Sequence, residues 1–367
     1  MNKVLVILAL FINSLCFSQR IIETKTKYVN PEFETETKNA KALVTDLMKE
    51  KSIPGLSITV ASKNKILWSE GFGLADLENK TPIKLNSKFR IGSISKSLTS
   101  IALGKLIEKG KINLSDTVQK LVPYFPKKKY QITIQELASH TSGIRNYNYK
   151  NGEYFSNVHY NTIKESIDIF KEDSLLFEPK TKYGYSTYGY VLLSAAIEEV
   201  AGQNFLDYMQ NNVFEPMGMY STVPDLNDKI IDNRVQFYQL RDGTIINASY
   251  IDNSNKWAGG GFLSSSLDLA KMSQHLLRKD IINKRTIELL WTPTQLADGE
   301  RTNYCLGWRR DVTESGNIYI HHGGSSVGGR SFLLIYPKDE IIVSITCNLF
   351  TRFNESLALE IAEKFKK

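Results

Sequence analysis

A hydroxyl and an amine stand one helical turn apart in the stretch Ser93-Ile94-Ser95-Lys96. A serine hydroxyl is a weak nucleophile until a neighbouring base removes its proton, and residues three apart share one face of a helix. The N-terminus of that helix would add partial positive charge where an oxyanion forms. Ser93 is therefore a candidate nucleophile with Lys96 as its partner, while the alternative is that Ser93 only caps the helix.

The segment from Ser93 to Lys109 has to position this pair. Its apolar residues recur at three- and four-residue spacing, which predicts a helix buried on one side that ends at Gly110. A second Ser-x-x-Lys match, Ser62-Lys63-Asn64-Lys65, lies between two alternating apolar runs. We interpret that match as a hairpin turn whose side chains face solvent.

A candidate phenol lies in the stretch from Tyr183 to Thr187, after Pro179 and Gly184. The stretch has the composition of a loop that presents Tyr185, although packing alone could also explain this tyrosine. Thr187 is a candidate N-cap of the helix that follows. His140, at a helix end beside Gly143, is more typical of a structural hydrogen-bonding residue than of a base.

Two histidines end an alternating run from Ile318 to His322. Side chains alternate along a strand, so His322 shares a face with Ile318 and Ile320, while His321 lies on the other face. The following Gly323-Gly324 would let a ligand or another backbone approach closely. In isolation, a polar strand end followed by a glycine turn is also a reasonable interpretation.

The composition is that of an ordinary globular protein. The 367 residues are 42% hydrophobic and 23% charged, and the net charge of +7 is scattered apart from Lys127-Lys128-Lys129. This does not indicate nucleic-acid binding. The chain has neither a His-Glu-x-x-His motif nor a cluster of cysteines and histidines, so we expect no metal and no cofactor.

The first residues resemble an export signal. Met1 to about Ser18 form a short apolar run with one lysine and a small-x-small end, which predicts a secretory signal peptide and a soluble protein in the periplasm or outside the cell, with no membrane span after cleavage. Cys305 and Cys347 would remain. We expect two small buried thiols, although an exported protein can oxidise a pair that lies adjacent.

The order of the elements predicts an α/β fold in which an antiparallel sheet is flanked by helices. We expect a loosely attached extension over residues 19–38 and a helix over 39–50. An α/β subdomain over 39–130 and 231–367 would hold an inserted helical subdomain over 131–230, with helices near 161–172 and 188–201. Four strands are expected at the end of the chain, followed by an amphipathic helix: Tyr304–Arg310, Asn317–His322, Ser331–Tyr336 and Ile341–Cys347.

Several blocks, in this order, resemble the serine beta-lactamase-like, penicillin-recognising hydrolases, which include class C beta-lactamases, D-alanyl-D-alanine carboxypeptidases, D-aminopeptidases and esterases. The resemblance runs from about Ile53 to Asn348, and its most specific blocks are Phe89–Lys96, Leu137–Ile144 and Ala258–Gly261. The blocks Lys182–Tyr190 and Asp252–Gly261 look most similar to the LACTB branch of that family.

The resemblance implies a role for each candidate. Ser93 matches the acylated serine, Lys96 its lysine partner and Tyr185 the tyrosine of the family's Tyr-x-Asn motif. The third motif falls on His322-Gly323-Gly324, or on His321-His322-Gly323 in the other register. The candidate oxyanion and substrate-binding groups are the backbone N–H groups of Ser93 and Ser325, together with Thr187, Gly324 and His321.

Two departures from the family pattern bear on the reaction. Thr187 replaces the family asparagine, and a histidine replaces the lysine of true beta-lactamases. We therefore expect an exported serine hydrolase that forms an acyl-enzyme with small peptides, amides or esters. The alternatives are a true beta-lactamase and a binding or scaffold protein that keeps the fold without catalysis. The sequence leaves open whether Lys96 or Tyr185 is the general base.

Overall fold

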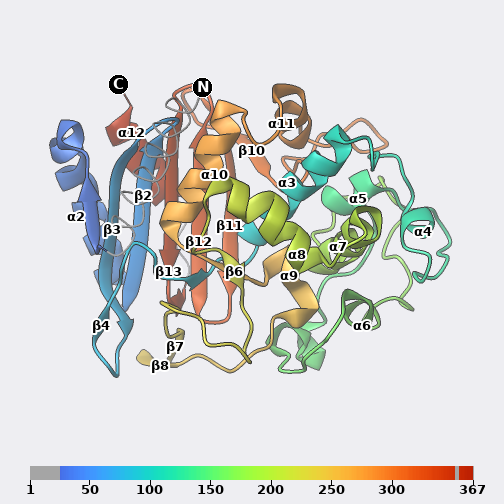
Figure 1. The fold of residues 1–367 in the computed structure, drawn as a ribbon, viewed down its shortest axis with the longest axis horizontal. Helices are drawn as coiled ribbons and strands as arrows, with labels where there is room; N and C mark the ends of the chain where they lie inside the picture. Colours follow the sequence, from blue (N-terminus) through green and yellow to red (C-terminus); the bar gives the residue numbers. More distant parts are fainter. Residues whose placement is uncertain (1–24, 352–354, 367) are drawn as a thin grey trace, which may run out of the picture.

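The computed structural model describes residues 25–351 and 355–366, so the predicted signal peptide lies outside the described residues. Its main feature is an eight-stranded antiparallel sheet (Figure 1). The strand order is β1-β3-β2-β13-β12-β11-β10, and β4 pairs with β3. The bounds are β1 Lys27–Val29, β2 Gly55–Ser62, β3 Ile66–Asp76, β4 Thr81–Pro82, β10 Arg309–Val312, β11 Ile318–Ser326, β12 Gly329–Tyr336 and β13 Ile341–Cys347.

Helices cover both faces of this sheet. Helices α2 (Glu34–Glu50) and α12 (Ser356–Phe365), from opposite ends of the chain, pack together on one face, and α10 (Ser266–Arg278) packs on the other across β2 and β13 (Figure 1). The predicted α/β architecture is confirmed, and the early hairpin β2–β3 completes the sheet by pairing with β13.

The start of the described chain differs from the expectation of a loose extension up to residue 38. Strand β1 pairs with β3, and α2 begins at Glu34. The buried ring of Phe33 stacks on Phe365, with the ring centroids 5.9 Å apart. The three-residue strand is too short to give a periodic signal, and its pairing depends on a distant strand.

Between residues 131 and 230 the regular elements are helices joined by long loops, with one short exception. The expected helix over 161–172 is only one and a half turns long, and a two-residue strand, β6, departs from the all-helical expectation. Elements here and nearby are α4 Val118–Leu121, α5 Ile134–Ala138, α6 Ile163–Ile167, α7 Thr187–Ala201, α8 Phe205–Met209 and β6 Val223–Pro224.

The remaining helices and strands belong to the segments before, between and after those described above. They are β5 Phe89–Arg90, α3 Ile94–Glu108, β7 Tyr238–Arg241, β8 Thr244–Asn247, α9 Trp257–Gly260, β9 Phe262–Ser264, α11 Lys284–Leu290 and β14 Leu349–Phe350. Single turns of 3₁₀ or π helix are η1 Pro31–Phe33, η2 Tyr149–Asn151, η3 Glu153–Phe155, η4 Gln210–Phe214, η5 Glu215–Met217 and η6 Ser254–Lys256.

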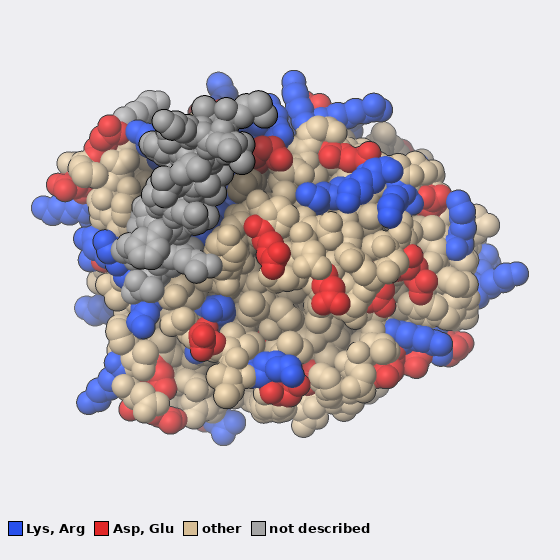
Figure 2. All heavy atoms as spheres, viewed as in Figure 1, with Lys and Arg blue, Asp and Glu red and all other residues tan. Residues whose placement is uncertain are grey.

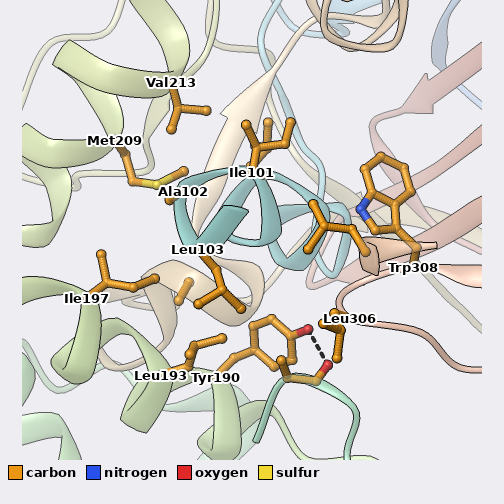
Figure 3. Close-up of a cluster of buried hydrophobic side chains, with 14 of the residues drawn as sticks. Ile101, Ala102, Leu103, Tyr190, Leu193, Ile197, Met209, Val213, Leu306 and Trp308 are labelled. Carbon is orange, nitrogen blue, oxygen red and sulfur yellow. Dashed lines mark hydrogen bonds between the residues drawn. The ribbon is translucent and has the colours of Figure 1, made fainter. Parts of the chain in front are cut away.

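Helix α3 is buried on nearly every side, whereas the sequence pattern predicted burial on one side. Figure 3 shows its residues Ile101, Ala102 and Leu103 among side chains from α7, the region after α8, and the segment before β10. Its hydroxyls tolerate burial because they find acceptors. Ser97 donates to the carbonyl of Gly307 at 2.8 Å, and Thr99 donates to that of Ala258 at 3.0 Å.

The last strands also differ in one place from the prediction. The run Tyr304–Arg310 was expected to be a strand, but β10 begins only at Arg309. The residues before it turn inward, and Gly307 with φ of +83° packs against the backbone of Lys96, where a side chain would collide. This detour brings Tyr304 into the interior, where its side chain is fully buried.

Cys305 and Cys347 are both buried and free. They belong to hydrophobic clusters on opposite faces of the sheet, so the open question of their pairing is answered against a disulfide. Within residues 25–351 and 355–366, no helix is long and apolar enough to cross a membrane. On the face drawn in Figure 2, basic and acidic side chains are interspersed.

Candidate active site

Ser93 occupies the N-cap position of α3 but does not cap it with its side chain. Its backbone is already helical, at φ −66° and ψ −6°, and its hydroxyl makes no capping hydrogen bond. The Ser93 oxygen instead accepts a hydrogen bond from the Tyr185 hydroxyl at 2.8 Å and lies 3.2 Å from the Lys96 amine. The capping alternative therefore does not describe this serine.

The Lys96 amine is fully buried and has three polar neighbours. They are the Gly259 carbonyl at 2.5 Å, the Ser93 hydroxyl at 3.2 Å and the Thr187 hydroxyl at 3.3 Å. Burial lowers the pKa of Lys96 well below its usual value, which favours the neutral amine. A neutral amine has two N–H donors, for Gly259 and Thr187, and one lone pair that can accept the Ser93 proton.

Tyr185 lies in a loop that is fixed by two hydrogen bonds to His140. The His140 carbonyl accepts the Gly184 N–H at 2.8 Å, and its ring nitrogen Nδ1 accepts the Ser186 N–H at 3.1 Å. The His140 and Tyr185 rings are in contact, with centroids 4.2 Å apart. Because Ser186 rather than Thr187 caps α7, the Thr187 hydroxyl is available to Lys96. His140 is thus a positioning residue for Tyr185.

The two candidate bases differ in their electrostatics. Burial raises the pKa of Tyr185 well above its ordinary value, whereas burial lowers that of Lys96. A phenol with a raised pKa remains protonated and can donate a hydrogen bond, as Tyr185 does to Ser93. This geometry is compatible with Lys96 as the base and Tyr185 as a hydrogen-bond donor, and the choice between the two bases stays a prediction.

His322 faces the same side of β11 as Ile320, as alternation predicted, but it does not line the cavity beside Ser93. Its Nε2 lies 3.0 Å from the hydroxyl of Tyr304 and its Nδ1 lies 2.7 Å from the Gly323 carbonyl. Burial, with Lys96 nearby, lowers the pKa of His322 well below its usual value, so the ring is neutral. The structure thus places His322 as a buried hydrogen-bonding partner of Tyr304, and its expected catalytic role stays a prediction.

His321 points to the opposite face of the sheet. Its Nε2 lies 2.7 Å from the Asp311 carboxylate, and Glu355 lies 3.8 Å from its other ring nitrogen. Its ring stacks on Phe332 in the cluster beneath α2 and α12. The expectation that His321 contacts substrate is therefore at odds with the structure, because the whole sheet separates it from Ser93.

Gly324 allows the strand β11 to pass directly against the chain that enters α3. A side-chain carbon at Gly324 would lie 1.9 Å from the Ile91 carbonyl oxygen, and one at Gly92 would lie 2.5 Å from the Ser325 nitrogen. The predicted close approach of another backbone is thus present at Gly324. Ser325 and Ser93 both line one cavity, which keeps their backbone N–H groups as candidates for an oxyanion hole.

The cavity has a volume of about 280 Å³ and brings together residues from distant parts of the chain. Its lining is Ser93, Asn146, Tyr147, Tyr149, Tyr154, Tyr185, Thr187, Lys256, Gly259, Gly260, Ser325, Ser326 and Phe350. Sequence reasoning missed Asn146, whose side-chain oxygen accepts the Thr187 N–H at 3.0 Å, and Lys256. Lys256 lay within a block that resembled the LACTB branch, but nothing in the sequence gave it a role.

The side chains around Ser93 can also be compared with those that bind metal ions. Over the described ranges, no group of three or more His, Cys, Asp or Glu side chains is arranged to hold a metal ion. The polar groups around Ser93 are hydroxyls, amines, amides and backbone groups.

Comparison with known proteins adds a family to this geometry. The model of the family described as Beta-lactamase matches residues 40–364, which is most of the chain. The chain belongs to the beta-lactamase family. Penicillin-binding protein 4* of Bacillus subtilis is 30% identical over 79% of this chain and 67% of its own.

Two further proteins that resemble this chain support the match. The human mitochondrial serine beta-lactamase-like protein LACTB is 31% identical, covering 91% of this chain and 80% of its own length. The octameric penicillin-binding protein homologue from Pyrococcus abyssi is 26% identical and superposes with a TM-score of 0.77, over 89% of this chain and 75% of its own. The resemblance inferred from the motif blocks is thus confirmed at the level of the family.

Proposed function

We propose that this protein is an exported serine hydrolase that forms an acyl-enzyme on Ser93 with small peptide, amide or ester substrates. The observation that carries the proposal is the Ser93 hydroxyl, which lines a cavity and lies within hydrogen-bond reach of the buried Lys96 amine and the Tyr185 phenol. Each partner has a distinct chemical task.

In the first step, Lys96 accepts the Ser93 proton while the Ser93 oxygen attacks the substrate carbonyl. The backbone N–H groups of Ser93 and Ser325 would stabilise the oxyanion of the tetrahedral intermediate. The leaving group departs with a proton supplied through the Lys96 ammonium and the Tyr185 hydroxyl. Water then attacks the acyl-enzyme with Lys96 again as the base, which restores the Ser93 hydroxyl and releases the acid.

The substrate preference follows from what lies beside Ser93. A family lysine in the third motif would give a fixed positive charge, whereas His322 is neutral and buried behind Tyr304. Thr187 uses its hydroxyl on Lys96 instead of offering a side-chain amide to substrate. These features favour peptides, amides or activated esters over beta-lactams. Export, proposed from residues 1–18, would place the enzyme among peptidoglycan peptides and other small substrates.

Covalent labelling tests the nucleophile. The protein is incubated with a serine-directed phosphonate probe and its intact mass is measured. We expect one adduct on the wild type and none on Ser93→Ala. The absence of an adduct on the wild type, or an equal adduct on the variant, would refute the assignment and favour a binding protein without catalysis.

A hydrolysis panel tests the substrate class. It compares nitrocefin, D-alanyl peptides, dipeptide amides and short-chain nitrophenyl esters, each with the wild type and with Ser93→Ala. We expect peptide or ester turnover to exceed nitrocefin turnover and to vanish in the variant. Faster turnover of nitrocefin would make the protein a beta-lactamase.

A further inference from the structure

Lys256 is a buried amine in the wall of the Ser93 cavity. It is 4% exposed and immediately precedes α9, the helix that supplies the Gly259 carbonyl to Lys96. Its amine lies 3.4 Å from the Tyr154 carbonyl and 5.6 and 5.5 Å from the ring centroids of Tyr147 and Tyr154. The Lys256 amine therefore has one long hydrogen bond and two cation–π contacts.

The acidic groups that affect Lys256 are bound to other partners. The Asp225 carboxylate accepts hydrogen bonds from Arg90 at 2.7 Å and from Asn253 at 2.8 Å. Asp252 lies 2.9 Å from a nitrogen of His159. The cavity lining itself, as described above, includes no Asp or Glu. Within the described chain, Lys256 is therefore a basic side chain in the cavity wall without a carboxylate partner in that wall.

Holding an ammonium group in this place is unfavourable unless an anion joins it. Burial, with Arg90 as a second cation, lowers the pKa of Lys256 to about 7. The aromatic rings compensate only in part, since cation–π contacts are individually weak. A carboxylate entering the cavity would supply the missing partner and replace the long hydrogen bond with a charge-assisted one.

We propose that Lys256 binds a carboxylate of the substrate, so that the enzyme selects acyl donors carrying an anionic group near the scissile bond. This inference rests on the proposed function, because it concerns the same cavity. Lys256 precedes α9 whereas the family's third motif lies on β11, and its lowered pKa means that it does not reproduce the fixed lysine charge of a beta-lactamase. The rings of Tyr147 and Tyr154 would form the apolar wall beside that carboxylate.

Matched arylboronic acids test the proposal. The 3- and 4-carboxyphenylboronic acids are each compared with the corresponding carbamoyl compound, which has nearly the same shape without the charge. On the wild type, the Ser93 oxygen adds to boron, its proton passes to Lys96 and nothing leaves. Calorimetry should show at least one acid binding about tenfold or more tightly than its amide.

Variants of Lys256 show whether this side chain causes the tighter binding of the acid. Lys256→Met should bring the acid-to-amide ratio close to one, whereas Lys256→Arg should keep the preference. Lys111→Met, which removes an exposed lysine, is the matched control and should leave the ratio unchanged. Circular dichroism verifies that each variant is folded, and Lys256→Arg keeps the test decisive if the methionine variant does not fold.

The Ser93→Ala background separates this proposal from the proposed function. Without the covalent bond all four compounds should bind more weakly, yet the acid should keep its advantage, and Lys256→Met should remove it. If Ser93→Ala weakens the binding of all four compounds and the acid-to-amide ratio stays the same, that result tests Ser93 as the nucleophile and not the role of Lys256. Equal binding of acid and amide, a preference that survives Lys256→Met, or no binding of the acids to either background would overturn the role of Lys256.

Discussion

The hydrogen bond from Tyr185 to Ser93 can be removed without removing the ring. Tyr185→Phe keeps the contact with His140 but deletes the 2.8 Å hydrogen bond. We expect kcat to fall by roughly 10²- to 10⁴-fold, the usual contribution of a positioned acid or base, while the thermal midpoint stays close to wild type. Steady-state kinetics on the preferred ester measures this, and an unchanged kcat would exclude Tyr185 from proton transfer.

The pH dependence of the reaction reports on Lys96. Because burial lowers its pKa, the amine loses its proton at a lower pH than an ordinary lysine does. We expect kcat/KM to increase with pH through this lowered pKa and to level off before the pH of ~10.4 at which an ordinary lysine titrates. A profile that rises only near pH ~10 would show an ordinary lysine and contradict the assignment. Lys96→Arg, which remains charged, should be inactive at every pH.

At the residue scale, the sequence predicted Ser93, Lys96 and Tyr185, because a helical spacing and a presented loop tyrosine leave a local signal. It did not predict that His322 would bond to Tyr304, since that contact depends on the inward course of the chain before β10. Lys256 was equally hidden, because one lysine among many has no local pattern that distinguishes a buried amine from a solvated one.

The contact between β11 and the entry to α3 predicts unequal effects of two neighbouring glycines. Gly324→Ala would place a carbon 1.9 Å from the Ile91 oxygen, so the backbone has to move beside the place where Gly92 lies against Ser325. We expect a loss of activity of about 100-fold or more together with a lower thermal midpoint. Thermal unfolding and ester hydrolysis measure the two effects.

The control for this change is Gly323→Ala. A carbon there meets only the ring of Phe332, at 3.6 and 3.8 Å, which is ordinary contact. This variant should keep most of its activity and stability. If both variants lost similar activity and stability, the two glycines would be needed for the conformational freedom of the backbone and not for the close approach of Ile91 to Gly324.

At the element scale, long periodic segments were predictable and short ones were not. The helix at Ser93 and the pairing of the early hairpin with the last strands follow from apolar spacing and short connections. The all-round burial of α3 could not be read from its sequence, because Ser97 and Thr99 look solvent-facing until their acceptors in other segments are known. Strand β1 gives too little pattern to be recognised.

For the whole molecule, the buried Lys256 should lower stability in a pH-dependent way. Its pKa of about 7 lies below the value of about 10.4 for an unfolded lysine, so between these pH values the unfolded chain binds more protons. Wild-type stability should therefore increase with pH across this window relative to Lys256→Met. The methionine variant should be more stable near pH 7, and its advantage should shrink towards pH 10.

Chemical denaturation of both proteins at several pH values measures this difference. Comparing the two chains cancels the contribution of the buried tyrosines that they share. A methionine variant that is less stable at neutral pH would indicate that Lys256 holds the fold together and is not kept for a ligand.

Cys305 and Cys347, on opposite faces of the sheet, make the fold indifferent to the redox state of its surroundings. Burial raises the pKa of Cys305 to about 12 and that of Cys347 to about 11, so neither side chain is a ready thiolate. The thermal midpoint should be the same with and without a thiol reductant. Within the described residues the fold is held by no disulfide, so we expect it to assemble in the reducing cytoplasm of an expression host as well as in an oxidising compartment.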